Sequence, residues 1–321
     1  MRPRFVPSTL NLLLDYSTSR LPSILSRMTI TLSPLEIWLH AIRPKTLFAS
    51  ISPIIVGSAV AYHEDGFHLP TALVALAVAV LLQILANLTN DYFDHKHGAD
   101  TDRVGPLRVM QAGLVTDRQM QTAIGINIAL AIAGGLYLVY RGGWPIFVLG
   151  LLAVICAVAY TGGPFPLGYH GLGELFVFVF FGLVGVAGSA YVQTRDLTWL
   201  AIFAAVPIGC LATAIIVANN LRDIESDRAA GKHTLATHLG RLGTIREYQG
   251  LIAIAYLIPL LLALFGGVPW AWLVIPVTLP LALPLVTAVQ TSAGKGLIPV
   301  LVGTSRLTFY FAAVFAMGLI L

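Results

Sequence analysis

Residues 197–228 read LTWLAIFAAVPIGCLATAIIVANNLRDIESDR. The first 24 positions of this stretch carry no charged side chain, whereas the last eight carry three acids and two bases. About 20 predominantly apolar residues are enough for a helix to cross the hydrocarbon core of a bilayer. The stretch therefore predicts a transmembrane helix that ends in a cluster of ionisable groups at one membrane surface.

The same arrangement occurs once earlier in the chain. Apolar residues from about 70 onwards end in Asn87-Leu-Thr-Asn90-Asp91-Tyr-Phe-Asp94, and further acids follow at Asp100 and Asp102. Four predicted helices separate the two acidic ends, which is typical of a duplicated four-helix unit. Duplicated membrane halves often place a site at their interface, with one motif from each half.

The composition places the whole chain in a membrane. Of its 321 residues, 57% are hydrophobic and 11% are charged, the mean hydropathy is +0.83, and the net charge of +4 is too small to indicate nucleic-acid binding. We expect an all-α fold with nine transmembrane helices around a central cavity, in two pseudo-repeated halves. The predicted helices lie near 35–62, 70–94, 117–140, 145–160, 172–194, 197–220, 244–265, 269–290 and 297–321.

Residues 1–33 differ from the transmembrane domain predicted for 34–321, because they are rich in Arg, Ser and Thr. They fit an organelle-type targeting segment, an extension upstream of a start at Met28, or a mobile basic tail. Almost all Lys and Arg residues lie in loops on the side of the N-terminus, so the positive-inside rule predicts that this side is cytoplasmic. The bacterial plasma membrane is the expected location, with an organelle membrane as the alternative.

The acids at the two helix ends recur at helical spacing. Positions three, four and seven apart share one helix face, so each set presents its oxygen atoms together. Mg²⁺ prefers carboxylate, amide and phosphate oxygens, and two such faces across a cavity would hold two ions bridged by a diphosphate. Solvated helix ends are the alternative, although ionisable groups at membrane depth favour function. The first set is Asn87, Asp91 and Asp94, and the second is Asn220, Asp223 and Asp227.

Basic residues lie among these acids. Guanidinium groups bind phosphate oxygens in pairs and ammonium groups act as point charges, so we expect Arg103, Arg108, Arg222 and Lys232 to hold phosphate. Their alternative role is to fix the membrane orientation. Tyr160 opens a loop of Gly and Pro residues, where its ring is either a π face for a cation or an interfacial anchor.

Four strings at these positions resemble the UbiA superfamily of intramembrane aromatic prenyltransferases, and within it the branch that prenylates 1,4-dihydroxy-2-naphthoate for menaquinone. The resemblance covers about residues 35–321. Gly98 and Pro164 stand where the wider superfamily often has Asp and Lys. The strings are Asn87-Leu-Thr-Asn-Asp-Tyr-Phe-Asp94, Asp102-Arg-Val-Gly-Pro-Leu-Arg108, Tyr160-Thr-Gly-Gly, and residues 219–235 from Asn-Asn-Leu-Arg-Asp to Gly-Lys-His-Thr-Leu.

The resemblance implies a cavity open sideways to lipid, Mg²⁺ as cofactor, a polyprenyl diphosphate donor and an aromatic acid acceptor that loses CO₂. It assigns Asn87, Asp91 and Asp94 to one Mg²⁺ and Asp223 and Asp227 to the other. Phosphate contacts then fall to Arg103, Arg108, Arg222, Lys232 and Asn220, and Tyr160 faces the carbocation.

Two alternatives stay open from the sequence. Another acceptor, such as homogentisate or 4-hydroxybenzoate, would require the same motifs. A secondary transporter also has internal repeats and broken helices, but it predicts ionisable groups near mid-membrane rather than at one rim.

Overall fold

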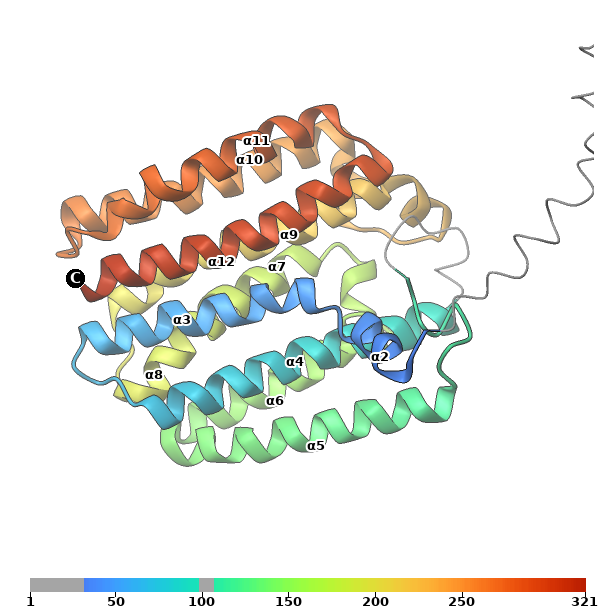
Figure 1. Cartoon of the computed structure of the whole chain (residues 1–321), viewed down its shortest axis with the longest axis horizontal. Helices are drawn as coiled ribbons and strands as arrows, with labels where there is room; N and C mark the ends of the chain where they lie inside the picture. The colour runs from blue at the N-terminus through green and yellow to red at the C-terminus, as the bar shows by residue number, and fades with distance from the viewer. Residues whose placement is uncertain (1–31, 98–106) are drawn as a thin grey trace, which may run out of the picture.

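The computed structural model describes residues 32–97 and 107–321, and all regular secondary structure within these ranges is helical. The long helices run side by side along one axis (Figure 1). Eight helical segments of the described chain are long and apolar enough to cross a membrane, and Trp144–Ala159 is apolar but shorter. The prediction of an all-α membrane protein is confirmed, and the count of nine holds if this short helix is included. The expected N-terminal extension lies almost wholly outside the described residues.

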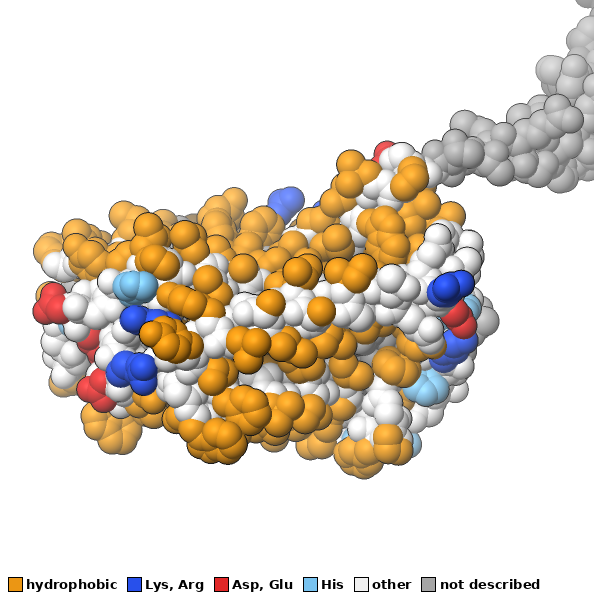
Figure 2. Space-filling view, turned by 90° about the horizontal axis from the view of Figure 1, so that it is seen from below, with side chains coloured by type: hydrophobic (Ala, Val, Ile, Leu, Met, Phe, Trp, Pro, Cys, Tyr) orange, Lys and Arg blue, Asp and Glu red, His pale blue; other side chains and the backbone are white. Residues whose placement is uncertain are grey.

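The surface agrees with a transmembrane orientation of the helices. Figure 2 shows hydrophobic side chains over the middle of the molecule, while most Lys, Arg, Asp, Glu and His side chains gather at its two ends. The first half of the chain forms α2 (Pro34–Ile42), η1 (Pro44–Thr46), α3 (Leu47–His63), α4 (Leu69–Lys96), α5 (Asp117–Gly142) and α6 (Trp144–Ala159). The second half forms η2 (Leu167–Tyr169), α7 (Gly173–Val177), η3 (Phe178–Ala187), α8 (Gly188–Thr194), α9 (Trp199–Ala229), α10 (Leu235–Phe265), η4 (Ala271–Leu273), α11 (Val274–Thr291), η5 (Gly294–Leu297) and α12 (Ile298–Ile320).

The helix predicted over 35–62 is interrupted. Arg43 has left-handed backbone angles, φ 55° and ψ 70°, and Pro44 follows it. A proline disfavours the α conformation at the preceding residue, which explains a helix end here. The resulting short helix α2 lies across the end of the bundle rather than along it (Figure 1). Its exposed Leu35 and Leu39 suit a helix at the membrane surface.

α9 ends later than predicted. The prediction stopped the helix at 220, whereas α9 continues to Ala229 and so carries the second acidic set on regular helix. α10 is divided near its start, because Gly240 has φ 67° and ψ 175° inside it. Only the part after Gly240 corresponds to the predicted span 244–265.

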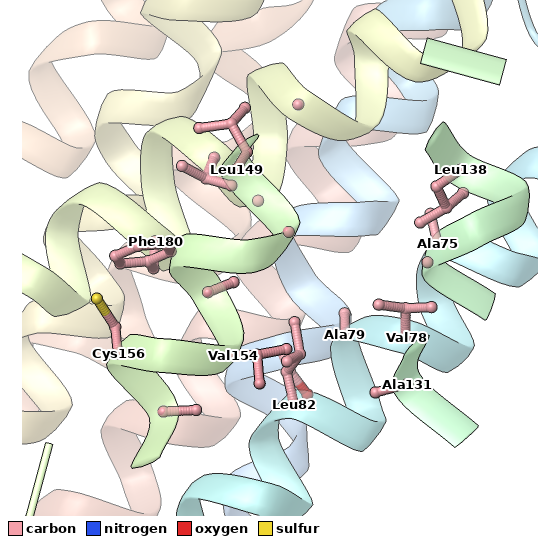
Figure 3. A pocket seen from close by; sticks show the side chains of 18 of the residues that line it. Ala75, Val78, Ala79, Leu82, Ala131, Leu138, Leu149, Val154, Cys156 and Phe180 are labelled. Atoms are coloured by element: carbon pink, nitrogen blue, oxygen red, sulfur yellow. The ribbon is translucent and has the colours of Figure 1, made fainter. Parts of the chain in front are cut away.

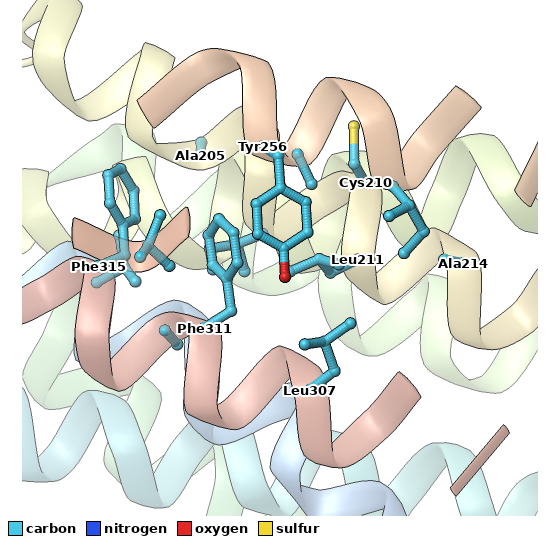
Figure 4. Packing of buried hydrophobic residues seen from close by; sticks show 14 of the residues in the cluster. Ala205, Cys210, Leu211, Ala214, Tyr256, Leu307, Phe311 and Phe315 are labelled. Atoms are coloured by element: carbon cyan, nitrogen blue, oxygen red, sulfur yellow. The ribbon is translucent and has the colours of Figure 1, made fainter. Parts of the chain in front are cut away.

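The second half of the bundle is densely packed. A continuous hydrophobic core joins α9, α10, α11 and α12 with η3 and part of α3. Figure 4 shows Tyr256 lying among Leu211, Phe311 and Leu307 in this core. The rings of Tyr256 and Phe311 are 5.4 Å apart, and the Tyr256 hydroxyl shares a 2.9 Å hydrogen bond with Thr278. Buried hydroxyls need such partners in a bilayer, so the aromatic packing and the polar pair stabilise the same contact.

The close approach between η3 and α9 depends on glycine. η3 is π-helical over ten residues, and such widened turns are frequent at functional sites. A Cβ atom at Gly182 would lie 2.7 Å from the Gly209 Cα and 3.0 Å from the Ala205 carbonyl oxygen. Small residues allow membrane helices to pack backbone to backbone, so Gly182 sets the distance between these two elements.

We expect Gly182→Ala to destabilise the protein by about 1–3 kcal/mol, because the added methyl group meets backbone atoms that cannot rotate away. The measurement is the apparent melting temperature in detergent. Gly125→Ala is the matched control, since nothing lies within 4 Å of a Cβ there. Equal melting temperatures for the two variants would contradict the assigned role of Gly182.

Candidate active site

The end of α4 buries its acids. α4 runs unbroken to Lys96, so Asn87, Asp91 and Asp94 share one helix face as their spacing predicts. Asp91 and Asp94 are only 1% and 3% exposed, although they lie in the last two turns. Buried carboxylates are costly unless they are paired or hydrogen-bonded, so their partners define the site.

Asp94 is the point where three chain segments meet. Its Oδ2 accepts a 2.9 Å bond from Arg108, which precedes α5. Its Oδ1 accepts from the Tyr169 hydroxyl at 2.7 Å and from the Lys232 ammonium at 3.2 Å. The same ammonium lies 4.4 Å from the centre of the Tyr169 ring. One carboxylate on α4 therefore ties together the residues after α4, the loop after α6 and the loop after α9.

Asp91 and Asn87 form hydrogen bonds with backbone groups of neighbouring segments. Asp91 Oδ2 accepts a 3.1 Å bond from the Val109 amide. The Asn87 amide group donates to the Ile42 carbonyl at 2.8 Å and to the Thr46 hydroxyl at 3.0 Å. These two acceptors flank the break between α2 and α3, so Asn87 fixes that turn against the site.

The end of α9 carries the second set. The Arg222 guanidinium donates through Nε to Asp223 at 2.7 Å and through Nη2 to Asn219 at 2.9 Å. Arg222 and Asp223 are both buried. Asp227 is half-buried, one helical turn further on. Asn220 points elsewhere, because its amide donates to Glu174 of α7 at 2.8 Å.

Tyr160 lies between the two sets. Its hydroxyl lies against Gly173 and its ring against Gly168, where Cβ atoms would approach to 2.7 Å and 3.0 Å. Burial raises the pKa of this hydroxyl, and the charges of Glu174, Asp94 and Asp227 raise it further. Carboxylates of both sets therefore act on the same tyrosine, which stays a neutral phenol.

An apolar cavity of about 450 Å³ begins at Tyr160 and Gln83 and lies between α3, α4, α5, α6 and the η3–α8 segment. Figure 3 shows Leu82 of α4 and Val154 of α6 among the side chains that line it. Ile146 near the start of α6 and Tyr160 directly after its end both line the cavity. At about 1.5 Å of rise per residue, the cavity is therefore about 21 Å long. All 16 residues of α6 are described and none is buried, because the helix lies between this cavity and the outer surface.

The cavity also opens to the side. Leu136 of α5 and Leu151 of α6 line it, and they are 62% and 51% exposed on the surface that would face lipid. An apolar chain inside the cavity would therefore stay in contact with the bilayer, as the family resemblance implies.

The donor atoms fit magnesium. The carboxylates at the two helix ends supply only oxygen, and an adjoining amide oxygen belongs to Asn87. Within residues 32–97 and 107–321, no three His, Cys, Asp or Glu side chains lie close enough to hold a metal ion alone. Mg²⁺ does not need such a group, since it is usually bound by one or two carboxylates together with substrate phosphates and water.

The structure brings together most of the predicted site and adds two residues. Asp91, Asp94, Arg108, Lys232 and Tyr160 lie around one region, with Arg222, Asp223 and Asp227 at the adjoining end of α9. Arg103 and Gly98 lie outside the described residues. The two added residues are Glu174 and Tyr169, neither of which was among the site residues predicted from the sequence. An acid directly after a charge-free loop was the signal for Glu174.

Comparisons with known proteins agree with this arrangement. The model of the UbiA prenyltransferase family matches residues 50–297. A protein of Mycobacterium tuberculosis called 1,4-dihydroxy-2-naphthoate octaprenyltransferase is 42% identical over 265 residues, covering 82% of this chain and 90% of the relative. A protein of the same name from Escherichia coli is 43% identical over 253 residues, covering 75% and 81%.

Solved structures show the same fold at low sequence identity. A UbiA homolog from Archaeoglobus fulgidus is similar with a TM-score of 0.64 and 16% identity, covering 88% of this chain and 99% of the homolog. A structure of a homolog from the same organism bound to GPP and Mg²⁺ has a TM-score of 0.61 and 16% identity, covering 87% and 99%.

We expect Arg108→Met to destabilise the protein by about 3 kcal/mol, because Asp94 would lose a buried cationic partner. The double variant Arg108→Met/Asp94→Asn should recover part of this loss, since the uncompensated charge is then absent. Unfolding in mixed detergent micelles measures both. A double variant that is less stable than Arg108→Met would contradict the view that the unpaired Asp94 charge causes the loss of stability.

Proposed function

The chain belongs to the UbiA prenyltransferase family, and on this premise we propose that it transfers a polyprenyl group from an isoprenoid diphosphate to 1,4-dihydroxy-2-naphthoate, with loss of CO₂, in menaquinone biosynthesis. The observation that carries the proposal is the 3.2 Å contact between Lys232 and Asp94, which joins the two acidic helix ends beside the apolar cavity. A charged diphosphate and an apolar tail need these two environments side by side.

The donor would bind with its tail in the cavity and its diphosphate among Arg108, Lys232 and Arg222. An isoprenoid chain is as apolar as the lining residues, so it enters without a desolvation cost. In the structure these cations pair with Asp94 and Asp223. Arginine forks match phosphate oxygens, so we infer that these ion pairs rearrange when the diphosphate binds. Arg103 belongs to the same proposed group but lies outside the described residues.

Asp91, Asp94, Asp223 and Asp227 would hold magnesium, with the Asn87 amide oxygen as a further donor on α4. Bound Mg²⁺ would supply charge stabilisation for the departing diphosphate. The cations of this chain would add to that stabilisation, since they are held in place before the bond breaks. Asn220, predicted to contact phosphate, is instead bonded to Glu174, so we do not propose it for this role.

The rest of the reaction depends on a dry pocket. The allylic carbon at the cavity entrance would lie near the Tyr160 ring, whose π face attracts positive charge. The apolar lining keeps water away from the developing carbocation. The electron-rich ring of the acceptor then attacks this carbon, and departure of its carboxylate as CO₂ leaves the electron pair that restores aromaticity.

We place the site at the cytoplasmic surface of a bacterial inner membrane. The support is the sequence bias of Lys and Arg toward the side that holds Asp94 and Lys232. A secondary transporter is disfavoured, because the buried carboxylates found among the described residues lie near this end rather than at mid-membrane.

The test of this function is incubation of the purified protein with Mg²⁺, prenyl diphosphates of several lengths, and a panel of aromatic acids, with products identified by mass. We expect prenylated naphthalenediol that lacks the carboxylate. Prenylation of homogentisate or 4-hydroxybenzoate in preference to the naphthoate would overturn the assigned acceptor.

Asp91→Ala and Asp223→Ala should each lower prenyl transfer by about 10²-fold or more, because each removes a carboxylate proposed to hold magnesium beside the diphosphate. Initial rates at saturating donor and acceptor measure the loss. Asp196→Ala, in the loop between α8 and α9 at the other end of the bundle, is the control and should match the wild type. Near-normal turnover in either site variant would rule out the metal assignment.

Gly150→Leu should reduce the use of long prenyl donors while sparing short ones. Gly150 lines the cavity, nothing lies within 4 Å of a Cβ there, and it is about 15 Å from Tyr160 along α6. Three backbone bonds of a peptide span about 3.8 Å, so the four chain bonds of an isoprene unit span about 5 Å. The leucine side chain would therefore obstruct the tail near its third isoprene unit. Gly125→Leu, outside the cavity lining, is the control. A uniform change across donor lengths would contradict the placement of the tail.

A further inference from the structure

Glu174 is a buried carboxylate that the proposed diphosphate machinery does not use. It lies in the first turn of α7 and is 6% exposed. Its Oε1 accepts the 2.8 Å bond from Asn220 of α9. Its Oε2 is buried and has no hydrogen-bond partner within the part of the chain that the structure describes. An acid at this depth is costly, so an unused acceptor atom on it indicates a ligand.

A second glutamate lies within electrostatic range of the first. The charge of Glu174 acts on Glu247 of α10, and the Glu247 Oε2 is likewise buried without a hydrogen-bond partner among the described residues. Asn220 lies between these helices as a neutral donor to Glu174. Three helices thus contribute to a polar cluster of two carboxyls and one amide, defined by Glu174, Asn220 and Glu247.

This cluster borders the reaction region at Tyr160. The Tyr160 hydroxyl lies against Gly173, the residue before Glu174, and Glu174 acts on Tyr160 through charge. Phe176 and Val177, within one turn of Glu174, line the cavity. A ring placed next to Tyr160 at the cavity entrance would therefore reach Glu174 with a substituent.

We propose that Glu174, supported by Glu247, binds a ring hydroxyl of the aromatic acceptor and so orients and activates that ring. The inference rests on the proposed function and assigns the acceptor side of its site. A hydroxyl donates a hydrogen bond, which is what the unpartnered Glu174 oxygen lacks. The carboxylate of the same acceptor is repelled by the two glutamates, so the ring enters with its hydroxyl toward Glu174 and its carboxylate away from it.

The proton balance is simple. As the ring carbon forms its bond to the allylic carbon, the hydroxyl proton moves toward Glu174 and electron density moves into the ring. The bond between the allylic carbon and the diphosphate oxygen breaks, and the bond to the carboxylate carbon breaks as CO₂ leaves. The proton then returns to the oxygen of the product, so Glu174 ends the cycle unchanged and no further reactant is needed.

Glu174→Gln tests this role, because glutamine keeps the shape and an oxygen for Asn220 but loses the charge that draws the proton. We expect kcat/KM for the dihydroxy acceptor to fall by about 10²-fold, with KM for the prenyl diphosphate unchanged. The decisive comparison uses monomethyl ethers of the acceptor. One of the two ethers lacks the hydroxyl that Glu174 binds, and the substitution should not lower activity with that ether further.

Glu225→Gln is the matched control, since the Glu225 side chain is 87% exposed at the end of α9. It should leave all acceptors unaffected, while Glu247→Gln should show a weaker form of the Glu174 pattern. An equal loss with the dihydroxy acceptor and with both ethers would assign Glu174 to structure alone and overturn the inference. Wild-type protein that transfers no prenyl group to the naphthoate would instead contradict the proposed function, so the two failures are distinguishable.

Discussion

The structure depends on compensating buried carboxylates at one end of an apolar bundle. Asp94 cannot stay ionised at 3% exposure without partners, and Arg108, Lys232 and Tyr169 provide them from three different segments. Each partner contacts the acid only if the residues after α4, the loop after α6 and the loop after α9 fold toward the same point. The electrostatic cost of one side chain therefore specifies the arrangement of the whole end of the molecule.

The two halves of the bundle differ in packing, and this difference creates the cavity. In the second half, buried aromatic and aliphatic residues fill the space between α9, α10 and α12. In the first half, α6 has no buried residue because its inner face borders empty volume. The glycine contact between η3 and α9 fixes the position of η3, which lines the cavity, against the densely packed helices. The densely packed second half can hold a charged head group in a fixed position. The loosely packed first half, with α6 at the cavity, can admit a long apolar chain from lipid.

The features that depend on helical periodicity could be predicted from the local sequence. The common face of Asn87, Asp91 and Asp94 follows from an unbroken helix, and so it could be predicted before the structure was known. The break at Arg43 was not predicted, because membrane helices also tolerate proline in their interior. The later end of α9 was not predicted either, because the polar residues from Asn219 onwards fit both a helix and a loop. Glu174 lies 46 residues from its partner Asn220, and Lys232 lies 138 residues from Asp94, which are separations at which local periodicity does not specify contact.

Both cationic and acidic side chains lie near Tyr160. Arg108 and Lys232 lie toward α4, where a departing anion would be stabilised. Glu174 lies on α7 and Glu247 on α10, and in the proposed arrangement their carboxyl groups would receive the acceptor hydroxyl rather than the diphosphate. Tyr160 itself remains neutral between them, because burial and the surrounding carboxylates raise the pKa of its hydroxyl. An allylic group formed there would meet the π face of Tyr160 while Arg108 and Lys232 hold its leaving group. The direction of transfer would then follow from the different partners of the two substrates, since the diphosphate needs the cations and the acceptor hydroxyl needs the Glu174 oxygen.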